Sequence, residues 1–551
     1  MAENISYYGD NLDILRRYIK DETVDLIYLD PPFKSEQDYN ILFAEQNGSR
    51  AAAQIKAFED TWRWDQASAA AYQEVVEAGP PRVSQVMQGF YTFMAGSDMM
   101  AYLAMMAPRL VELRRVLKPT GSIYLHCDPT ASHYLKILMD AVFGPVYFRN
   151  EIVWKRTSAH SDSGTCGNTH DVLLLYTKGD KFVWNRQFQT YDQAYVESHY
   201  RYSDSKGRRY RTDNLTAIGL RGGGYEYEWH GVKKIWRLPK ERMAELEKQG
   251  RIRYTRTGTA EYIRYLDEMP GVPLQDLWTD IAPINPQAKE RLGYPTQKPE
   301  ALLERIIQVS SNKRDMVLDP FCGCGTAVVV AERLKRRWIG IDITHLAVAL
   351  MKHRLRDAFG RKVKYKVVGE PVSLPDAKAL AESDPYQFQW WVLGLVGARP
   401  VEQKKRADKG IDGRLYFHDE ADKKKAKTKQ IMLSVKSGRV SVSDVRDLRG
   451  VVGREKAQIG VLISMQQPTK AMRAEAASAG FYRSPWGKHA ILQILTIEGL
   501  LKGKTIDYPD IPGVNVTFKK APKAKGKKIE HPKFGCMEDI RGNVNGATFG
   551  I

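Results

Sequence analysis

The chain has 551 residues, which is enough for at least two domains. Its hydrophobic fraction of 43% and charged fraction of 27% are typical of a soluble globular protein, and no apolar stretch is long enough to span a bilayer. The start of the chain lacks the basic and apolar leader of a secreted protein, and the five cysteines show no regular spacing. We therefore expect a cytoplasmic protein without a disulfide framework and without membrane contact.

The formal net charge of +19 suits a polyanionic partner, because neutralised phosphates release their counterions. A basic protein that binds no nucleic acid is the alternative. The eleven tryptophans and 28 tyrosines offer stacking surfaces for bases, which favours nucleic acid.

The first predicted strand ends at Tyr8-Gly9-Asp10, and Leu12, Leu15 and Ile19 follow at helical spacing. Asp10 suits the N-cap of that helix, and it also suits a ligand pocket. We expect its strand to lie near the next one.

The next strand, Val24–Leu29, runs directly into Asp30-Pro31-Pro32-Phe33. Two prolines have no amide hydrogens, so they end the strand in a stiff, open corner. An acid and an aromatic ring are then presented where open α/β sheets bind ligands. This pair suits the exocyclic amine and the flat face of a nucleobase. An ordinary proline loop with a capping Asp is an equally favoured alternative.

The middle of the chain alternates predicted helices and strands before its amino-acid composition changes. The pattern predicts a helix over 94–117, a turn at 118–121, and strands at 122–127, 150–156 and 171–176. His126 and Asp128 end the first of these strands, where a structural role is the more common one. From about 178 to 280 the chain is basic and aromatic, with Arg209, Arg211 and Arg221 in arginine-tyrosine and arginine-glycine stretches. Arginine contacts guanine edges and phosphates, so this region is interpreted as DNA-recognising, with an irregular packed insertion as the alternative.

A glycine turn stands late in the chain. Asp319-Pro320-Phe321-Cys322-Gly323-Cys324-Gly325-Thr326 lies between a strand and a helix, and the next strand ends in Asp342. Glycines let the backbone approach a ligand, and an acid at that place binds ribose hydroxyls. The spacing differs from the dinucleotide pattern, so a pyrophosphate ligand is not required.

Three motifs now stand in a fixed order: D-P-P-F, then Tyr294-Pro295-Thr296-Gln297-Lys298-Pro299, then D-P-F-x-G-x-G-T. In this order they resemble the permuted, β-group, amino-methylating DNA methyltransferases, over roughly the first two thirds of the chain. The resemblance implies a Rossmann-like α/β methyltransferase fold with an inserted target-recognition region, S-adenosylmethionine as cofactor, and double-stranded DNA as partner. It is compatible with a homodimer.

The resemblance also implies residue roles. Phe33 would stack on a flipped base, while Asp30 and the Pro31 carbonyl would accept the two amine hydrogens, with Pro32 completing the corner. The implied cofactor residues are Asp10, Thr296, Lys298, Asp319, Phe321, Gly323, Gly325 and Asp342. Asp342 would hold the ribose, and Thr296 and Lys298 would lie near the cofactor carboxylate. D-P-P favours adenine, with the cytosine amine as the alternative.

The methyltransferase domain is predicted to span 1–368, followed by a polar linker at 369–383, a second domain at 384–510 and a basic tail at 511–551. The second domain resembles the PD-(D/E)xK nuclease fold in its Mrr-like branch, a smaller restriction-endonuclease-like α/β domain. By this resemblance Asp412 matches the first metal-binding acid and Lys436 the catalytic lysine, while Ser434 replaces the second acid. Magnesium binding and cleavage are therefore in doubt, and no metal site is predicted firmly; Glu402 is a candidate substitute acid.

Two further hypotheses stay open beside the methyltransferase. One is a single-chain restriction-modification protein with a working nuclease, against which Ser434 argues. The other is a non-catalytic DNA-binding protein, against which the intact motifs argue. An RNA methyltransferase is less favoured because the permuted motif order resembles that of DNA enzymes.

Overall fold

The computed structural model describes residues 3–32, 64–157, 164–217, 224–285, 287–292, 294, 296–401, 410–419, 428–509 and 516–518. Phe33, Arg221, Glu402 and nearly all of the predicted tail lie outside these residues. Two compact units divide the described residues: one is built from Met1–Asn185 and Asp276–Lys525, and the other from Arg186–Gln275. Each is described by itself.

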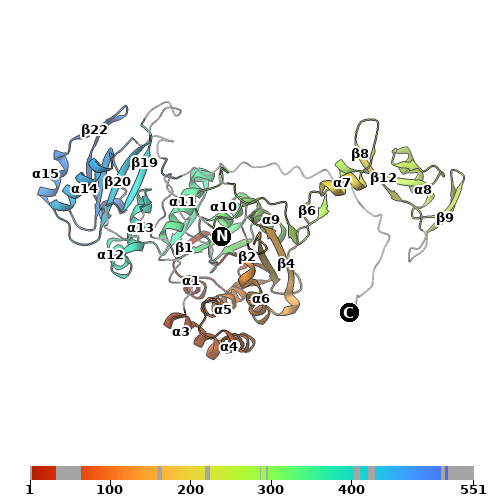
Figure 1. Cartoon of the computed structure of the whole chain (residues 1–551), viewed down its shortest axis with the longest axis horizontal. Coiled ribbons are helices and arrows are strands. Elements are labelled where there is room, and N and C mark those ends of the chain that lie inside the picture. The colour runs from red at the N-terminus through yellow and green to blue at the C-terminus, as the bar shows by residue number, and fades with distance from the viewer. Residues whose placement is uncertain are drawn as a thin grey trace. The chain divides into compact units, whose positions relative to one another are not determined.

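The first unit contains a nine-stranded sheet (Figure 1). In spatial order its strands are β14 (Leu277–Trp278), β4 (Phe148–Lys155), β5 (His170–Thr177), β3 (Leu117–Cys127), β2 (Val24–Leu29), β15 (Met316–Asp319), β16 (Arg337–Asp342), β1 (Asn4–Tyr8) and β17 (Tyr365–Val368). β5 runs antiparallel to both of its neighbours, and the other pairs are parallel. The buried strands are apolar on both faces, as parallel sheets covered by helices require.

Helices cover both faces of this sheet. Ile123 and Leu125 of β3 share one core with helices α1 (Asn11–Tyr18), α5 (Asp98–Val116) and α6 (Pro129–Phe143). Tyr124, between them, points the other way, and its hydroxyl lies 2.7 Å from Ser310 Oγ of α9 (Glu300–Ser310). Helices α10 (Thr326–Arg333) and α11 (His345–Phe359) belong with α9, whereas α3 (Gln66–Ala78) and α4 (Pro81–Met94) pack outside α5. The expected α/β fold is confirmed.

The order of the strands places the topological switch point of the sheet between β2 and β15. β15 continues through α10 to β16 on one side, whereas β2 continues to β3 on the other. β2 and β15 are themselves paired, with Leu26 opposite Val317 and Ile27 opposite Leu318. Connections that leave two neighbouring parallel strands in opposite directions open a ligand crevice at their carboxyl ends.

Three details differ from the sequence predictions. The predicted turn at 118–121 lies within β3, at a register shift against β2, where Leu117 pairs with Val24 and the next paired residue, Ser122, with Leu26. β1 does not neighbour β2, because β15 and β16 lie between them. The predicted linker at 369–383 contains helix α12 (Leu374–Ser383), which is started by a capping box between Ser373 and Asp376 and by a proline in its first turn.

A five-stranded sheet forms the C-terminal part of the first unit. Its order is β18 (Arg399–Pro400), β19 (Gly413–Phe417), β20 (Lys429–Lys436), β21 (Ile459–Ser464) and β24 (Leu492–Thr496). The accompanying elements are α13 (Pro385–Leu395), α14 (Val442–Arg454), α15 (Lys470–Ser478), α16 (Ile497–Leu501) and the hairpin β22 (Phe481–Ser484) and β23 (Gly487–Ala490). One hydrophobic core packs α13 and α16 on this sheet. A second core packs α14 and α15 on it.

The second unit has a small core of its own, which includes Trp229, Trp236 and Met243. Its four-stranded sheet has the order β11 (Ile252–Tyr254), β12 (Ala260–Tyr265), β8 (Arg209–Asn214) and β7 (Tyr202–Ser203). The hairpin β9 (Tyr225–Trp229) and β10 (Val232–Trp236), the pair β6 (Phe188–Gln189) and β13 (Val272–Pro273), and helices α7 (Gln193–His199) and α8 (Lys240–Lys248) complete it. Across the described residues of both units, no helix is long and apolar enough to cross a membrane.

Candidate active site

The two predicted motifs meet in the crevice between β2 and β15. Asp30 directly follows β2, and Asp319 ends β15. Burial raises the pKa of Asp319 well above its usual range, and the negative charges of Asp30 and Asp342 raise it further. The charges of Asp30 and Asp342, from two other motifs, therefore both reach Asp319 at this edge of the sheet.

Asp30 is paired with Lys298. The Lys298 Nζ donates to Asp30 Oδ2 at 2.5 Å, and the two side chains are only 13% and 14% exposed. Thr296 lies in the same partly buried stretch ahead of α9, Pro31 is buried and Pro32 half-buried. The structure thus brings Lys298 to the predicted base-binding acid; its role toward the cofactor, like that of Thr296, stays a prediction, and Phe33 lies outside the described residues.

The glycine turn after β15 requires its glycines. Gly323 and Gly325 have φ of +47° and +74°, a region that side chains disfavour. A Cβ on Gly323 would lie 3.0 Å from the Tyr294 ring, and one on Gly325 would lie 2.5 Å from Met351 Cγ. Bare backbone in a tight turn, next to an aromatic ring, fits the predicted cofactor.

Asp342 holds this turn by a hydrogen bond to its backbone. The Gly323 N–H donates to Asp342 Oδ2 at 2.9 Å, and the Thr344 N–H and hydroxyl both donate to Oδ1 at 2.9 Å. Burial raises the pKa of Asp342, while these donors oppose the rise. The ribose role of Asp342 stays a prediction, and so does the lining role of Phe321, which packs partly buried on the core.

Asp10 caps α1, accepting from Leu12 N at 2.8 Å, and also pairs with the buried Arg109 at 2.6 Å. Arg109 Nε donates to Asn11 Oδ1 at 2.6 Å, and Asn11 Nδ2 donates to the Pro320 carbonyl at 2.9 Å. The start of α1 is thereby tied to the glycine turn. The predicted cap is confirmed, and the cofactor role of Asp10 stays a prediction.

A buried hydrogen-bond chain that the sequence analysis missed crosses the strands beside the crevice. The Tyr28 hydroxyl lies 2.9 Å from His126 Nδ1, and His126 Nε2 lies 3.0 Å from Asp171 Oδ2. Burial raises the pKa of Asp171, but His126, Lys298 and Arg156 outweigh it and hold that pKa below its usual value. Asp128 caps α6, so its role is structural.

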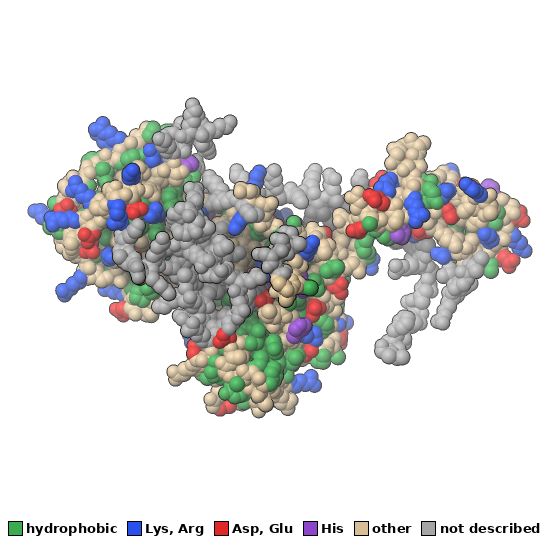
Figure 2. All heavy atoms as spheres, viewed as in Figure 1, with side chains coloured by type: hydrophobic (Ala, Val, Ile, Leu, Met, Phe, Trp, Pro, Cys, Tyr) green, Lys and Arg blue, Asp and Glu red, His purple; other side chains and the backbone are tan. Residues whose placement is uncertain are grey.

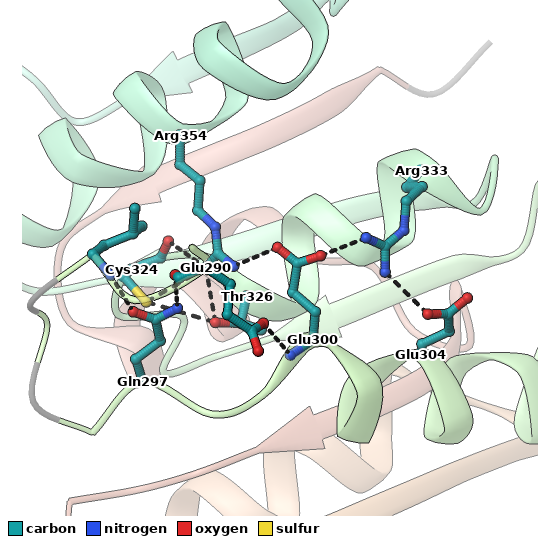
Figure 3. A network of polar contacts seen from close by, with 9 residues as sticks. Glu290, Gln297, Glu300, Glu304, Cys324, Thr326, Arg333 and Arg354 are labelled. Atoms are coloured by element: carbon teal, nitrogen blue, oxygen red, sulfur yellow. Dashed lines mark hydrogen bonds and ion pairs between the residues drawn. The ribbon is translucent and has the colours of Figure 1, made fainter. Parts of the chain in front are cut away.

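A second network ties the start of α9 to the glycine turn (Figure 3). Arg354 of α11, 1% exposed, donates to Glu300 Oε1 at 2.9 Å, to Thr326 Oγ1 at 2.9 Å and to the Cys324 carbonyl at 3.3 Å. Glu300 also pairs with Arg333, which reaches Glu304 at 3.2 Å. These pairs hold the first turns of α9 against both ends of α10, Thr326 through Arg354 and Arg333 directly.

Two of the three predicted DNA-contacting arginines can be placed, and both belong to β8 of the second unit. Arg209 Nε donates to the Tyr200 carbonyl at 3.2 Å, and Arg211 Nη1 donates to the Tyr195 hydroxyl at 2.9 Å. Each is therefore held by its own unit. Arg221 lies outside the described residues.

In the C-terminal domain the candidate nuclease residues Asp412 and Ser434 are brought together. Asp412 Oδ2 accepts from the Val435 N–H at 2.6 Å and from the Ser434 hydroxyl at 3.3 Å. Lys436 ends the same strand, β20. Within the described ranges, no group of three His, Cys, Asp or Glu side chains is placed to hold a metal ion.

Known proteins match two stretches of the chain. A family model described as DNA methylase (N6_N4_Mtase) matches residues 24–353, and one described as NACHT-associated inactive Restriction Endonuclease 1 matches residues 386–499. The second makes the C-terminal domain similar to an inactive nuclease family, which supports the nuclease-like resemblance only in this coarser form.

Individual relatives agree with the first match. The Type II methyltransferase M.EcaI of Enterobacter cloacae is 34% identical over 266 residues, covering 47% of this chain and 58% of its own length. The Type III restriction-modification enzyme StyLTI Mod subunit of Salmonella typhimurium is 27% identical over 388 residues, covering 67% of this chain and 56% of its own length. The solved M1.HpyAVI-SAM complex has 15% identity and a TM-score of 0.29, covering 64% of this chain and all of its own. The chain thus spans little more than half the length of these curated relatives, and by the match over residues 24–353 it belongs to the DNA methylase family.

Proposed function

We propose that this chain transfers a methyl group from S-adenosylmethionine to the exocyclic amine of a flipped adenine in double-stranded DNA. One observation carries the proposal: the D-P-P corner and the glycine turn follow two paired parallel strands, β2 and β15, at the point where the sheet's connections diverge. A base amine at Asp30 and a cofactor at Gly323 would therefore be neighbours. The target base must leave the stack to reach such a crevice.

The cofactor supplies an electrophilic methyl group on its sulfonium. Asp30 and the Pro31 carbonyl accept the amine hydrogens and orient the nitrogen lone pair, and Phe33 stacks on the base. Gly323, Gly325, Phe321 and Asp319 line the cofactor side. Positioning of the two reactants is the main source of rate, and no covalent enzyme intermediate is needed.

Adenine is favoured over cytosine because the motif reads D-P-P, and the cytosine amine is the alternative. The test is transfer of labelled methyl to duplex DNA, followed by digestion to nucleosides and mass spectrometry. We expect N6-methyladenine from the wild-type chain and none from Asp30→Ala, which should still bind the cofactor. Wild-type turnover by Asp30→Ala would refute the catalytic role of Asp30.

For the C-terminal domain we propose DNA binding without efficient cleavage, on an Mrr-like nuclease fold. Figure 2 shows Lys and Arg side chains spread over this domain, where Arg446 and Arg449 are 67% and 51% exposed. Its predicted metal acid, Asp412, is engaged by Val435 and Ser434 rather than by a second carboxylate. A restriction-modification fusion that uses magnesium is the competing proposal, and a homodimer and a cytoplasmic location remain part of the overall hypothesis.

A further inference from the structure

The pairing of Asp30 with Lys298 conflicts with the role proposed for Asp30. An acid that accepts a base amine acts best with its full negative charge, yet the Lys298 ammonium compensates that charge and donates to one of the two carboxylate oxygens, Oδ2, at 2.5 Å. Both side chains are largely buried. Moving the ammonium away leaves a poorly solvated carboxylate and a poorly solvated cation, which is costly unless each gains a new partner.

The proposed cofactor carries the partner that Lys298 would need. Its methyl group must lie beside Asp30, and a short methylene chain joins the sulfonium to an α-carboxylate. Lys298 also acts on Asp319, since its positive charge opposes the rise in the pKa of that acid. The ammonium is therefore close to both walls of the crevice, and a lysine has a flexible stem that allows it to change partners.

We propose that Lys298 is a positioning residue with two alternative partners. Without cofactor, Lys298 forms an ion pair with the Asp30 carboxylate. With cofactor, Lys298 pairs with the methionine carboxylate instead, and Asp30 is free to accept the target amine. Cofactor binding would then precede capture of the base. This inference rests on the proposed methyltransferase function and assigns Lys298 a role in the order of binding.

The test is a double-mutant cycle on the full-length chain, measured by titration calorimetry with two probes. S-adenosylhomocysteine has the carboxylate but no sulfonium, so the charge of Asp30 does not attract its sulfur. 5′-Methylthioadenosine lacks the carboxylate. The variants are Asp30→Asn, Lys298→Gln and the double substitution.

We expect Asp30→Asn to tighten S-adenosylhomocysteine binding by about threefold to thirtyfold, which lies within the range of coupling between contacting residues. Lys298→Gln should weaken that binding and remove the effect of Asp30→Asn. 5′-Methylthioadenosine should bind all four proteins alike. Equal or weaker S-adenosylhomocysteine binding by Asp30→Asn would overturn the inference, and so would the same gain in the Lys298→Gln background.

A matched pair stands at the other end of the same strand. Lys118 Nζ donates to Asp25 Oδ1 at 2.7 Å at the start of β2, away from the crevice. Asp25→Asn and Lys118→Gln should show no coupling in the same titrations. A wild-type chain that binds no S-adenosylhomocysteine would refute the proposed function and this inference with it, whereas wild-type binding without coupling would refute only the inference.

Discussion

Arg354 and Glu300 form an ion pair of 2.9 Å although the arginine is 1% exposed and the glutamate side chain 15%. The same guanidinium donates to the carbonyl of Cys324, inside the glycine turn. Burial raises the pKa of Glu300, but Arg354 and Arg333 outweigh it and hold that pKa below its usual value. The pair therefore joins α9, α11 and the turn that is proposed to hold the cofactor.

We expect Arg354→Met to destabilise the first unit by about 1–3 kcal/mol, because it leaves Glu300 with Arg333 as its remaining ionic partner and removes a buried hydrogen-bond donor. Cofactor affinity should fall as well, since the Cys324 carbonyl loses its donor. Chemical denaturation and calorimetry measure the two effects. Arg356→Met, at an exposed position of the same helix, is the matched control and should change neither. If Arg354→Met and Arg356→Met behaved alike, the network would have no positioning role.

Asp342→Ala should weaken cofactor binding by about 1–3 kcal/mol, the loss expected when hydrogen bonds to a charged group are removed. The loss should be equal for S-adenosylhomocysteine and 5′-methylthioadenosine, since both contain the ribose. A loss confined to S-adenosylhomocysteine would place Asp342 on the carboxylate side instead. Unchanged affinity for both would remove it from the site.

The sequence predicted those parts of the fold that local pattern determines. The apolar runs at β2, β5 and β16 and the proline corner after β2 are examples, because each depends on neighbouring residues alone. Ser373 and Asp376 indicate a capping box in the sequence. The interpretation of 369–383 as a linker missed this signal and with it helix α12. The turn predicted at 118–121 lies inside β3, at the place where the pairing with β2 shifts register between Leu117 and Ser122, so local sequence indicated the interruption but not the strand around it.

The partners of the site residues were not predictable in this way. Lys298 reaches Asp30 across 268 positions in the chain, and Arg354 reaches Glu300 across 54. Such contacts follow from strand order, which a single sequence does not encode locally. The chain Tyr28, His126 and Asp171 was missed for the same reason, although alternate positions on neighbouring strands were the available signal.

The buried imidazole of His345 should lower the free energy of unfolding in mild acid. Its side chain is 1% exposed, stacks on Tyr8 with ring centroids 3.5 Å apart, and neither ring nitrogen has a hydrogen-bond partner among the described residues. Burial, helped by the charge of Lys352, lowers the pKa of His345 to about 3. Between about pH 6.5 and pH 3 the unfolded chain therefore binds a proton that the folded chain does not, so stability is lost as the pH falls.

His345→Phe keeps the ring stack and removes this titration. Relative to wild type, we expect it to gain about 2 kcal/mol more at pH 5 than at pH 7, seen as a higher melting temperature in acid. His133→Phe, at an exposed position of α6, should leave the pH dependence unchanged. Parallel melting curves for wild type and His345→Phe across this range would contradict the assignment.

The last prediction concerns cleavage by the C-terminal domain. Hard divalent cations are held mainly by charged oxygen ligands. Asp412 supplies one carboxylate, but its Oδ2 accepts from Val435 N at 2.6 Å, and Ser434 stands where a second acid would be needed. Metal occupancy should therefore be low, and we expect the full-length chain to bind DNA yet nick it weakly or not at all with magnesium.

The assay uses unmethylated plasmid that carries the site identified by sequencing of modified bases, first with magnesium and then with manganese. Ser434→Glu restores the missing acid and is the informative variant, with Ser464→Glu, on the neighbouring strand β21, as the control. Cleavage gained by Ser434→Glu and lost again in Ser434→Glu/Asp412→Ala would show a nuclease framework that lacks one ligand. Robust cleavage by the wild-type chain that disappears in Asp412→Ala would instead establish a restriction-modification fusion, in which an acid outside the described residues, such as Glu402, completes the metal site.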